Sequence, residues 1–478
     1  MTDQPVIYSF AADQFQVEPG SPVQLAWAVG NVTSLELNGA NVMGTSGLTV
    51  RPNGSADYVL TARNAQGVRS EAVRVRVLSP GEPIISEFMA DNPGDVTLDE
   101  DSYSSDWIEI CNPGALAAPL DGYYLTDDPQ NPTKWRFPQV VMPPGSYLVV
   151  FASGKDRRDP NAELHTNFAL DDRGEYLALV KPDGVSVVMD FHPTFPAQRA
   201  EVSYGFEEES VKEGYFLEPT PGSENGANFT GFVGDTMFSL DRGFYDAPIE
   251  VAVTTSEAGA HIRYTIDGTE PTAVRGRVYD GPIRISRTTV LRAAGFKPGF
   301  VPTNIDTQTY LFLEDVIQQS NTQPGYPTVW AGKRADYEMD PNIVNDPAYS
   351  ADMIEALKNF PTLSIAIDRD QMFAAGGLYQ NPQSQGDAWE RPVSAELIIP
   401  DGSEPGFQVN AGMRIQGGSS RNPDIPKHSL SLRFRRQYGP GKLRYPLFAD
   451  APSGHSAVEE FDFLQLRSGF NLPWCHRH

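Results

Sequence analysis

A glycine- and serine-rich turn carries the residue types that contact phosphate groups in proteins. The stretch GMRIQGGSSRNPDIPKHSLSLRFR runs from Gly412 to Arg435, and apolar residues alternate with polar ones on both sides of its double glycine. This period of two predicts two strands, because successive side chains of a strand point to opposite faces. Backbone N–H groups of a glycine turn, hydroxyl groups and a strand-borne lysine are the donors that hold nucleotide phosphates.

The candidate phosphate-binding residues follow from these side-chain types. Lys427 is the strongest candidate, because it is predicted to enter the second strand on its polar side. The full set is Lys427, Arg421, Arg414, Gly417, Gly418, Ser419 and Ser420. Other interpretations stand beside this one. Gly-Gly-Ser-Ser between strands is also an ordinary loop, and the two arginines also suit structural ion pairs. His428 shares a face with Leu430, which predicts a core or interface position.

The elements that position this turn are predicted to be mostly strands. The chain has 478 residues with 42 Gly and 40 Pro, so we expect several small, turn-rich β domains. A net charge of -25 argues against a nucleic-acid partner, since such binding needs clustered cations. No apolar run approaches the roughly 18 residues of a membrane span. The two cysteines, Cys111 and Cys475, provide no disulfide framework.

Residues 1–80 predict a small antiparallel sandwich. Val23, Leu25 and Trp27 share one face of an alternating segment. A second alternating segment closes the module, and in it Arg74 and Arg76 alternate with valines. The pattern resembles an immunoglobulin-like or fibronectin-like module. We expect the arginines on the outer side and assign the module a spacer or adhesion role.

Residues 81–228 contain PIISEFMADNP, SDWIEICNPG and PTPGSEN in succession. This succession resembles the lamin-tail domain, which implies an immunoglobulin-like β-sandwich. The residues that carry the resemblance are Ile84, Glu87, Asn92, Asp106, Trp107, Ile108, Glu109, Asn112 and Pro113.

Acidic side chains gather in residues 91–106 of that segment. They are Asp91, Asp95, Asp99, Glu100, Asp101 and Asp106. Calcium binds through several carboxylate oxygens, so this loop is a candidate calcium site. The spacing fits no EF-hand, however, and an acidic loop in a chain of this charge is more often solvated.

Residues 236–313 include IRYTIDGTEPT, which resembles the fibronectin-III-like repeat found beside chitobiase and hexosaminidase catalytic domains. The resemblance implies an accessory β-sandwich with no catalytic residue of its own. Asp267 and Glu270 have the residue types of a glycoside-hydrolase acid pair. Their place in an Asp-Gly turn favours turn chemistry instead.

Residues 314–350 are expected to be a linker, and residues 351–478 begin with a short helix that Ser350 would cap and Pro361 would end. The rest of this segment resembles the spore-coat CotH family of atypical protein kinases. The blocks that carry the resemblance include Pro361, Leu363 and Ile365; Trp389, Glu390 and Glu396; Gly412, Arg414, Gly417 and Ser420; Lys427 and Ser429; Tyr445, Pro446 and Phe448; and Leu466, Arg467 and Ser468.

The CotH resemblance implies ATP and magnesium as cofactors and phosphate transfer to serine or threonine. The family's magnesium-binding aspartates lie beyond the LRSG block, close to which this sequence stops. We therefore expect a truncated α+β kinase-like small lobe, inactive as given, within a mainly β multidomain chain of tandem immunoglobulin-like sandwiches. The start MTDQPVIYSF also lacks a secretory signal. We expect a fragment of a larger secreted or surface bacterial protein; a natural degenerate form is the alternative.

Two functions follow. In the first, the intact protein is a kinase that acts on a protein substrate at the cell surface or outside the cell, and β modules target it. In the second, the chain is a non-catalytic scaffold for adhesion to polysaccharide or cell envelope. Loop aromatics such as Tyr123, Tyr124 and Trp135 are candidates for stacking on sugars, although such rings also belong to sandwich cores.

Overall fold

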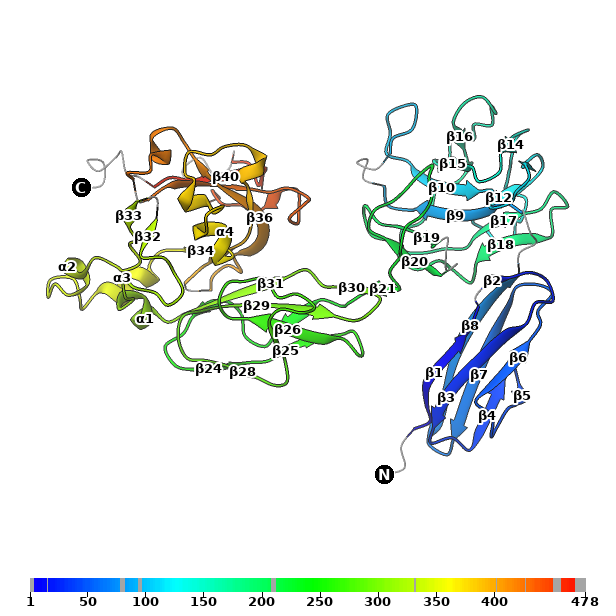
Figure 1. Cartoon of the computed structure of the whole chain (residues 1–478), viewed down its shortest axis with the longest axis horizontal. Coiled ribbons are helices and arrows are strands. Elements are labelled where there is room, and N and C mark those ends of the chain that lie inside the picture. The colour runs from blue at the N-terminus through cyan, green and yellow to red at the C-terminus, as the bar shows by residue number, and fades with distance from the viewer. Residues whose placement is uncertain are drawn as a thin grey trace. The chain divides into compact units, whose positions relative to one another are not determined.

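The structure is a computed structural model of the chain, and it consists mainly of β-strands, as the sequence predicts (Figure 1). It describes residues 4–14, 16–77, 82–92, 97–207, 212–330, 332–400, 402–425, 427–449 and 457–468. The chain folds into two compact units, Met1–Gly231 and Phe232–His478. Within the described ranges, no helix has the length and apolar character that crossing a bilayer requires.

Two sheets enclose the core of the first module. One contains β1 (Val6–Ala12), β3 (Val23–Gly30) and β6 (Gly47–Val50) in that order; the other contains β2 (Gln16–Val17), β8 (Gly67–Val77), β7 (Ala56–Asn64), β4 (Ser34–Leu37) and β5 (Ala40–Asn41). Val23, Leu25 and Trp27 are buried between the sheets, which confirms the predicted inner face. Period-two patterning alone was enough to find this face.

The second module in the same unit also has two main sheets. The larger has the order β16 (Leu164–His165), β15 (Tyr147–Ala152), β10 (Asp106–Cys111), β9 (Ile84–Met89), β19 (Ser203–Phe206) and β20 (Glu213–Phe216). The smaller has the order β13 (Trp135–Arg136), β12 (Tyr124–Thr126), β17 (Leu177–Val180) and β18 (Val187–Phe191), and β11 (Ala118–Pro119) pairs with β14 (Val141–Met142). The strand β21 (Gly231–Phe232) follows.

Two buried glutamates fasten the end of this second module to its central strands. Glu87 on β9 accepts hydrogen bonds from the backbone N–H of Thr220, at 3.2 Å, and from the hydroxyl of Ser203. Glu109 on β10 accepts from the N–H of Gly222 at 2.6 Å. Both glutamates are fully buried. Because a buried carboxylate must be hydrogen-bonded to be tolerated, these contacts fix the position of the turn at 220–222.

The arginines expected on the outer side of the first module contact the second module instead. Arg74 pairs with Asp190 and with Asp57. Arg76 is buried, pairs with Glu213, and lies over the ring of Phe206 at 4.6 Å. The alternation along β8 placed these side chains on the correct face, but that face is covered rather than solvated.

The third segment forms a compact β module at the start of the second unit. Its main sheet has the order β23 (Gly243–Phe244), β31 (Asp306–Leu311), β29 (Thr289–Phe296), β26 (His261–Thr265) and β27 (Arg277–Val278). Facing pairs are β22 (Thr236–Phe238) with β25 (Val253–Thr255) and β24 (Ile249–Val251) with β28 (Ile283–Ile285), and β30 (Phe300–Val301) precedes β31. The buried residues Val251, Leu291 and Tyr310 form its core.

The terminal segment is built on one antiparallel sheet. Its order is β34 (Thr362–Ala366), β35 (Arg391–Ile398), β36 (Phe407–Gln416), β37 (Ser429–Arg433) and β40 (Phe463–Leu466), and β38 (Leu443–Arg444) pairs with β39 (Glu460–Phe461). The helices of this unit are short: α1 (Leu313–Ile317), α2 (Pro341–Val344), α3 (Met353–Lys358) and α4 (Arg369–Phe373), with 3-10 turns at Leu378–Gln380, Asp387–Trp389 and Ser419–Arg421. The pair β32 (Val329–Trp330) and β33 (Lys333–Arg334) lies within residues 314–350.

The predicted short helix is present as α3, but its start was predicted wrongly. Asp352 occupies the N-cap position, and no side chain caps the helix. Ser350 lies two residues too early, because its backbone N–H still bonds to Asp346 in the preceding turn.

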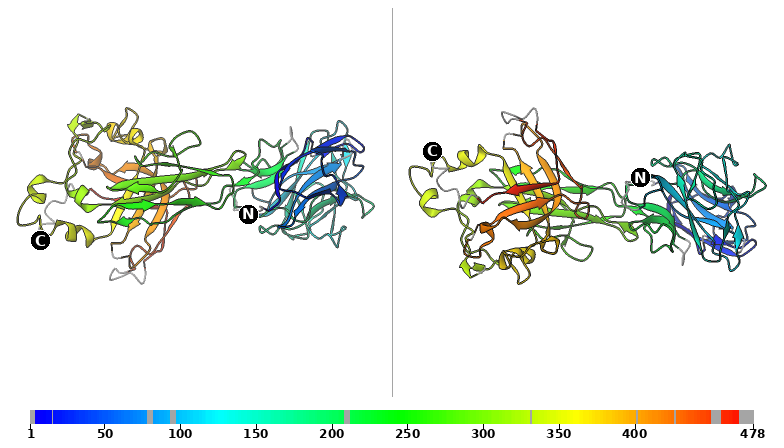
Figure 2. Two further views of the ribbon diagram at one scale, coloured as in Figure 1. Left: turned by 90° about the horizontal axis from the view of Figure 1, so that it is seen from below. Right: turned by 90° about the horizontal axis from the view of Figure 1, so that it is seen from above.

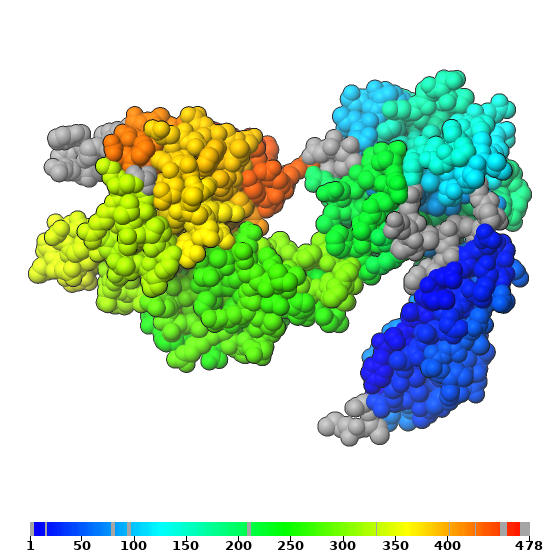
Figure 3. Space-filling view, viewed as in Figure 1, coloured from blue at the N-terminus to red at the C-terminus, as the bar shows by residue number. Residues whose placement is uncertain are grey.

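The third and terminal segments pack against each other inside the second unit. The views in Figures 2 and 3 show the green strands of the third segment against the yellow and orange terminal segment. Thr309 on β31 bonds to Glu396 on β35 and to Ser364 on β34, at 2.8 Å between the two hydroxyl oxygens for the last pair. Glu396 is fully buried, and Arg242 lies 3.6 Å from its carboxylate. A buried polar joint therefore connects the two segments.

Candidate functional site

The predicted glycine turn connects two paired strands. β36 and β37 run antiparallel, and Gln416 and Ser429 are the last pair before the turn. Ala411, Met413 and Ile415 belong to the core cluster of the terminal segment. The two strands and their inner face are confirmed, but β37 begins at Ser429, so Lys427 precedes the second strand instead of lying in it.

The turn is closed by its own side chains. The hydroxyl of Ser420 donates to the carbonyl oxygen of Gln416 at 2.5 Å, and the carbonyl oxygen of Ser420 lies 2.5 Å from Nδ1 of His428. His428 is buried against Tyr379, as its position on the Leu430 face predicts, and burial lowers its pKa. Gly417 has φ of +105°, and a Cβ there would lie 2.4 Å from the Ser420 hydroxyl oxygen. The structure thus brings Gly417, Ser420 and His428 together as a folded turn.

The remaining candidates divide by exposure. Gly418, Ser419 and Lys427 are exposed, while Arg421 is half-buried. Arg414 pairs with Asp387 at 3.3 Å. This last contact is the structural ion pair named as the alternative for that arginine.

Arg414 belongs to a charged cluster on the polar face of the terminal sheet. Asp387 also pairs with Arg435 at 2.9 Å, and Arg435 lies 3.3 Å from the buried carboxylate of Glu390. Arg433 lies 3.9 Å from the same carboxylate. The Arg435 hydrogen bond lowers the pKa of Asp387. The phosphate-binding role of Arg414 and of the other candidates stays a prediction.

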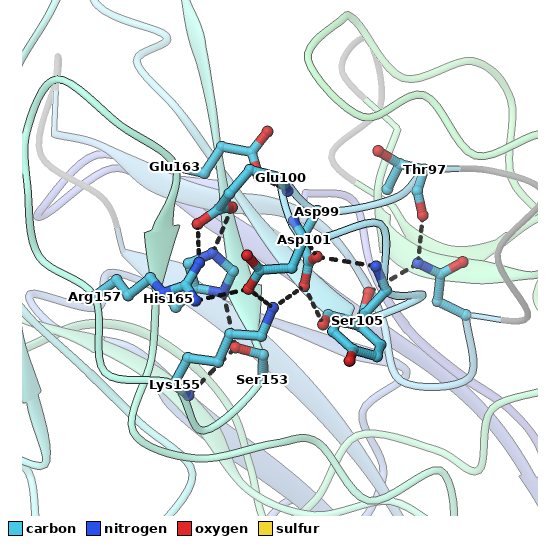
Figure 4. A network of polar contacts seen from close by, with 12 residues as sticks. Thr97, Asp99, Glu100, Asp101, Ser105, Ser153, Lys155, Arg157, Glu163 and His165 are labelled. Atoms are coloured by element: carbon cyan, nitrogen blue, oxygen red, sulfur yellow. Dashed lines mark hydrogen bonds and ion pairs between the residues drawn. The ribbon is translucent and has the colours of Figure 1, made fainter.

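The acidic loop of the second module is bound to basic side chains of the loop that follows β15 (Figure 4). Asp99 is buried, and its carboxylate lies 2.6 Å from Nζ of Lys155. Asp101 lies 2.8 Å from the same nitrogen and 2.6 Å from Nη2 of Arg157. Arg157 also pairs with Glu100. These carboxylates are therefore neutralised in part by the chain itself rather than by solvent alone.

The pKa values in this loop follow from those contacts. Burial alone would raise the pKa of Asp99, but hydrogen bonds from Lys155 and Ser105 lower it to about 2. Hydrogen bonds from Lys155 and Arg157 lower the pKa of Asp101. Asp106 behaves in the opposite way, since burial raises its pKa to about 6 and neighbouring Asp91 adds to the effect. Asp95 lies outside the described residues, and calcium binding by residues 91–106 stays a prediction.

Sequence reasoning missed the basic half of this network. Lys155 and Arg157 follow Asp99 and Asp101 by more than fifty residues, so no local pattern joins them. The available signal was the basic stretch GKDRRD directly after the strand β15. His165 was missed because a single histidine beside a leucine gives no metal-ligand spacing.

The acids of the third segment have structural roles. Asp267 accepts a hydrogen bond from the backbone N–H of Thr269 at 3.1 Å, next to Gly268 with φ of +81°. Glu270 lies 3.3 Å from Nη2 of the buried Arg292. Turn chemistry therefore accounts for Asp267, and an ion pair accounts for Glu270.

Comparison with known proteins supports the description of the two central segments. Residues 77–193 match the family model described as Lamin Tail Domain, and residues 240–307 match the Chitobiase/beta-hexosaminidase C-terminal domain. A protein of Ruminiclostridium cellulolyticum, described as uncharacterized, is 28% identical over 117 residues. The match covers 23% of this chain and 31% of that protein, so this chain spans about a third of its length.

Solved structures of immunoglobulin-domain arrays show only distant similarity. A titin I-band fragment, I67–I69, is 10% identical with a TM-score of 0.16, and covers 65% of this chain and 99% of its own. Three N-terminal domains of the bacteriophage RB49 Hoc protein are 9% identical with a TM-score of 0.16, and cover 64% and 99%. Similarities this low support no inference. The lamin-tail and chitobiase-type resemblances are confirmed by the family models, and the chain carries these two domains within a mainly β protein.

Proposed function

We propose that this chain is a non-catalytic, extracellular or surface scaffold whose β modules attach it to a polysaccharide or to the cell envelope. The observation that carries the proposal is the match of residues 240–307 to a domain named for chitobiase and hexosaminidase, enzymes of carbohydrate breakdown. A lamin-tail domain precedes it in the same chain. Accessory modules of this kind fit a binding role better than a catalytic one.

The local chemistry agrees with a binding role. The two acids that resembled a hydrolase pair are accounted for by a turn and by an ion pair with Arg292. A catalytic carboxyl pair flanks a scissile bond and must be free to exchange protons. Glu270 is held by a buried guanidinium and so does not fit that task.

The aromatic candidates for sugar stacking change in the light of burial. Trp135 is fully buried against Phe137, so it cannot stack on a ligand. Tyr123 and Tyr124 are half-buried. Tyr103 is 66% exposed. Among the described residues of 77–193, it is the one phenylalanine, tyrosine or tryptophan whose side chain is exposed. Its ring lies 5.0 Å from Nζ of Lys155, which orients it at the rim of the acidic loop. An exposed ring beside polar groups suits a pyranose face.

A glycan array probed with the full chain tests this proposal. We expect binding to one class of glycans, and a five- to tenfold weaker signal for Tyr103→Ala, since loss of one stacked ring costs about 1 kcal/mol. Tyr8→Ala is the matched control, because Tyr8 is 70% exposed in the first module. Equal binding by the two variants would show that Tyr103 does not contact the glycan. No binding by any of the three proteins on the array would contradict the proposal.

A second candidate is nucleotide contact by the terminal segment, as the CotH resemblance implies for the intact domain. The specific support is that Gly418, Ser419 and Lys427 are all exposed in the connection between β36 and β37. ATP with magnesium would be the ligand, held by these donors. For this chain we expect no phosphate transfer. An ATP-dependent rise in melting temperature that disappears in Lys427→Ala would favour this candidate over a purely passive terminal segment.

A further inference from the structure

Three potential metal ligands meet at the edge of the second module. Glu163 and His165 lie at β16, and Glu100 comes from the loop between β9 and β10 (Figure 4). One ligand atom from each residue lies within 4.8 Å of the other two. Both glutamates are exposed, whereas His165 is fully buried. An ion can therefore enter from solvent while the imidazole stays fixed.

The imidazole is oriented toward the two carboxylates. Nδ1 of His165 lies 2.8 Å from the hydroxyl oxygen of Ser153, and Nε2 lies 2.8 Å from a carboxylate oxygen of Glu100. The ring stacks on Phe151, with the ring centroids 5.4 Å apart. A histidine that binds a metal through one nitrogen characteristically has its other nitrogen engaged by an oxygen. Ser153 supplies that second contact.

The charges around the ring do not balance. Four carboxylates meet here, those of Asp99, Glu100, Asp101 and Glu163, and the cations that pair with them are Lys155 and Arg157. Within the part of the chain that the structure describes, no lysine or arginine lies in ion-pair contact with Glu163. Its partners are the backbone N–H of Glu100, at 2.7 Å, and the carboxyl group of Glu100. With a neutral His165 and no shared proton, the four carboxylates outnumber these two cations by two.

Contact between two carboxyl groups requires a positive charge between them, which is either a shared proton or a cation. The ligand oxygens of Glu100 and Glu163 lie within 4.8 Å of each other, and both side chains are open to solvent. A divalent ion would replace a shared proton and balance the remaining charge. The nearby Nε2 atom of His165 would then be its third ligand.

The ligand types select the kind of ion. Calcium takes six to eight oxygen ligands and does not favour imidazole. One imidazole nitrogen with two carboxylates suits zinc and its neighbours, and three protein ligands leave a fourth position for water. We propose that Glu100, Glu163 and His165 form a binding site for a divalent transition-metal ion, for which zinc is the probe. This site is separate from the polysaccharide contact proposed at Tyr103.

Zinc titration of the full chain by isothermal calorimetry tests the site. Cys475, His476 and His478 lie close together in the sequence and would also bind zinc, so all proteins carry serine or alanine at these three positions. We expect one zinc ion per chain and no calcium binding at this site. Glu163→Gln should weaken zinc affinity at least tenfold, because one of three ligands loses its charge. Asp159→Asn, in the same loop but outside the cluster, should leave the affinity unchanged.

A thermal-unfolding measurement in the presence of a chelator separates ligand loss from misfolding. Without metal, Glu163→Gln should melt at the same temperature as the parent protein or higher, because the amide removes the contact between two carboxyl groups. Zinc should then raise the melting temperature of the parent and of Asp159→Asn but not of Glu163→Gln. Absence of stoichiometric zinc binding, or equal zinc affinity of the parent and Glu163→Gln, would overturn the proposal.

Discussion

The carboxylate of Glu396 accepts a hydrogen bond from the backbone N–H of Thr309 at 3.2 Å, and a second from the hydroxyl of the same residue. Thr309 belongs to the chitobiase-type module and Glu396 to the terminal sheet. The contact is fully buried, and burial raises the pKa of Glu396 to about 7. The joint between the two segments is therefore sensitive to protonation near neutral pH.

The stability of this joint should fall as the pH rises from about 4.5 to about 7. A carboxyl group whose pKa is raised on folding binds its proton more tightly in the folded state, so deprotonation favours unfolding. The full effect is at most about 3 kcal/mol. Hydrogen exchange of β31 and β35 at pH 5.5 and 7.5, corrected for intrinsic rates, measures it. Glu396→Gln should leave only the smaller pH dependence that comes from Asp306 at the start of β31, whose pKa burial raises to about 6, whereas the exposed control Glu250→Gln should retain the full effect. A wild-type joint that is equally stable at both pH values would contradict this account of Glu396.

Arg76 should carry much of the contact between the first two modules. Its guanidinium is buried, pairs with Glu213, and covers the ring of Phe206. Arg76→Ala leaves a partly buried carboxylate without its cation, so we expect the unfolding free energy to fall by about 2 kcal/mol. Arg69→Ala, at an exposed position near the start of the same strand, should change it by less than about 0.5 kcal/mol. Urea unfolding measures both values, and equal effects would rule out a special role for Arg76.

These joints mark the limit of what the sequence could predict. Local alternation identified the strands and their inner faces, as at Leu25 and Met413, because strand geometry repeats every two residues. Alternation cannot say what covers the outer face. Arg74 meets Asp190, which follows it by 116 residues, and that pairing depends on how two modules pack.

For the candidate site, as for the strands, the sequence predicted the local elements but not the contacts between side chains. The glycine turn between β36 and β37 followed from residue type. The closure of that turn by Ser420, and the pairing of Arg414 with Asp387, depend on side-chain positions that no spacing encodes.

The two glycines of the turn should respond differently to substitution. Gly417→Ala places a Cβ at positive φ and 2.4 Å from the Ser420 hydroxyl oxygen, so we expect a loss of about 1–3 kcal/mol. Gly418 has an ordinary negative φ, and the space that a Cβ would occupy there is open, so Gly418→Ala should be nearly neutral. Thermal unfolding of the two variants makes the comparison, and equal melting temperatures would argue against the turn geometry.

Lys155 should protect the first unit against acid. Hydrogen bonds from Lys155 and Ser105 outweigh burial and lower the pKa of Asp99 to about 2. A lowered carboxyl pKa gives stability that is present above the unfolded value, near 3.8, and is lost as the pH falls toward 2. Lys155→Met removes the cation, so acid unfolding should begin at a higher pH than in wild type. Arg158→Met, which breaks an exposed pair with Asp156, should unfold as wild type does. Circular dichroism between pH 5 and pH 2 follows the transition, and coincident curves for wild type and Lys155→Met would contradict the prediction.

Cosedimentation of the full chain with insoluble polysaccharide tests the proposed function most directly. Chitin, cellulose and peptidoglycan are incubated with wild type, Tyr8→Ala and Tyr103→Ala, and the bound fraction is measured against polymer concentration. The account predicts saturable binding of wild type and Tyr8→Ala to at least one polymer, with five- to tenfold weaker binding of Tyr103→Ala. Recovery of all three proteins in the supernatant with every polymer would contradict it.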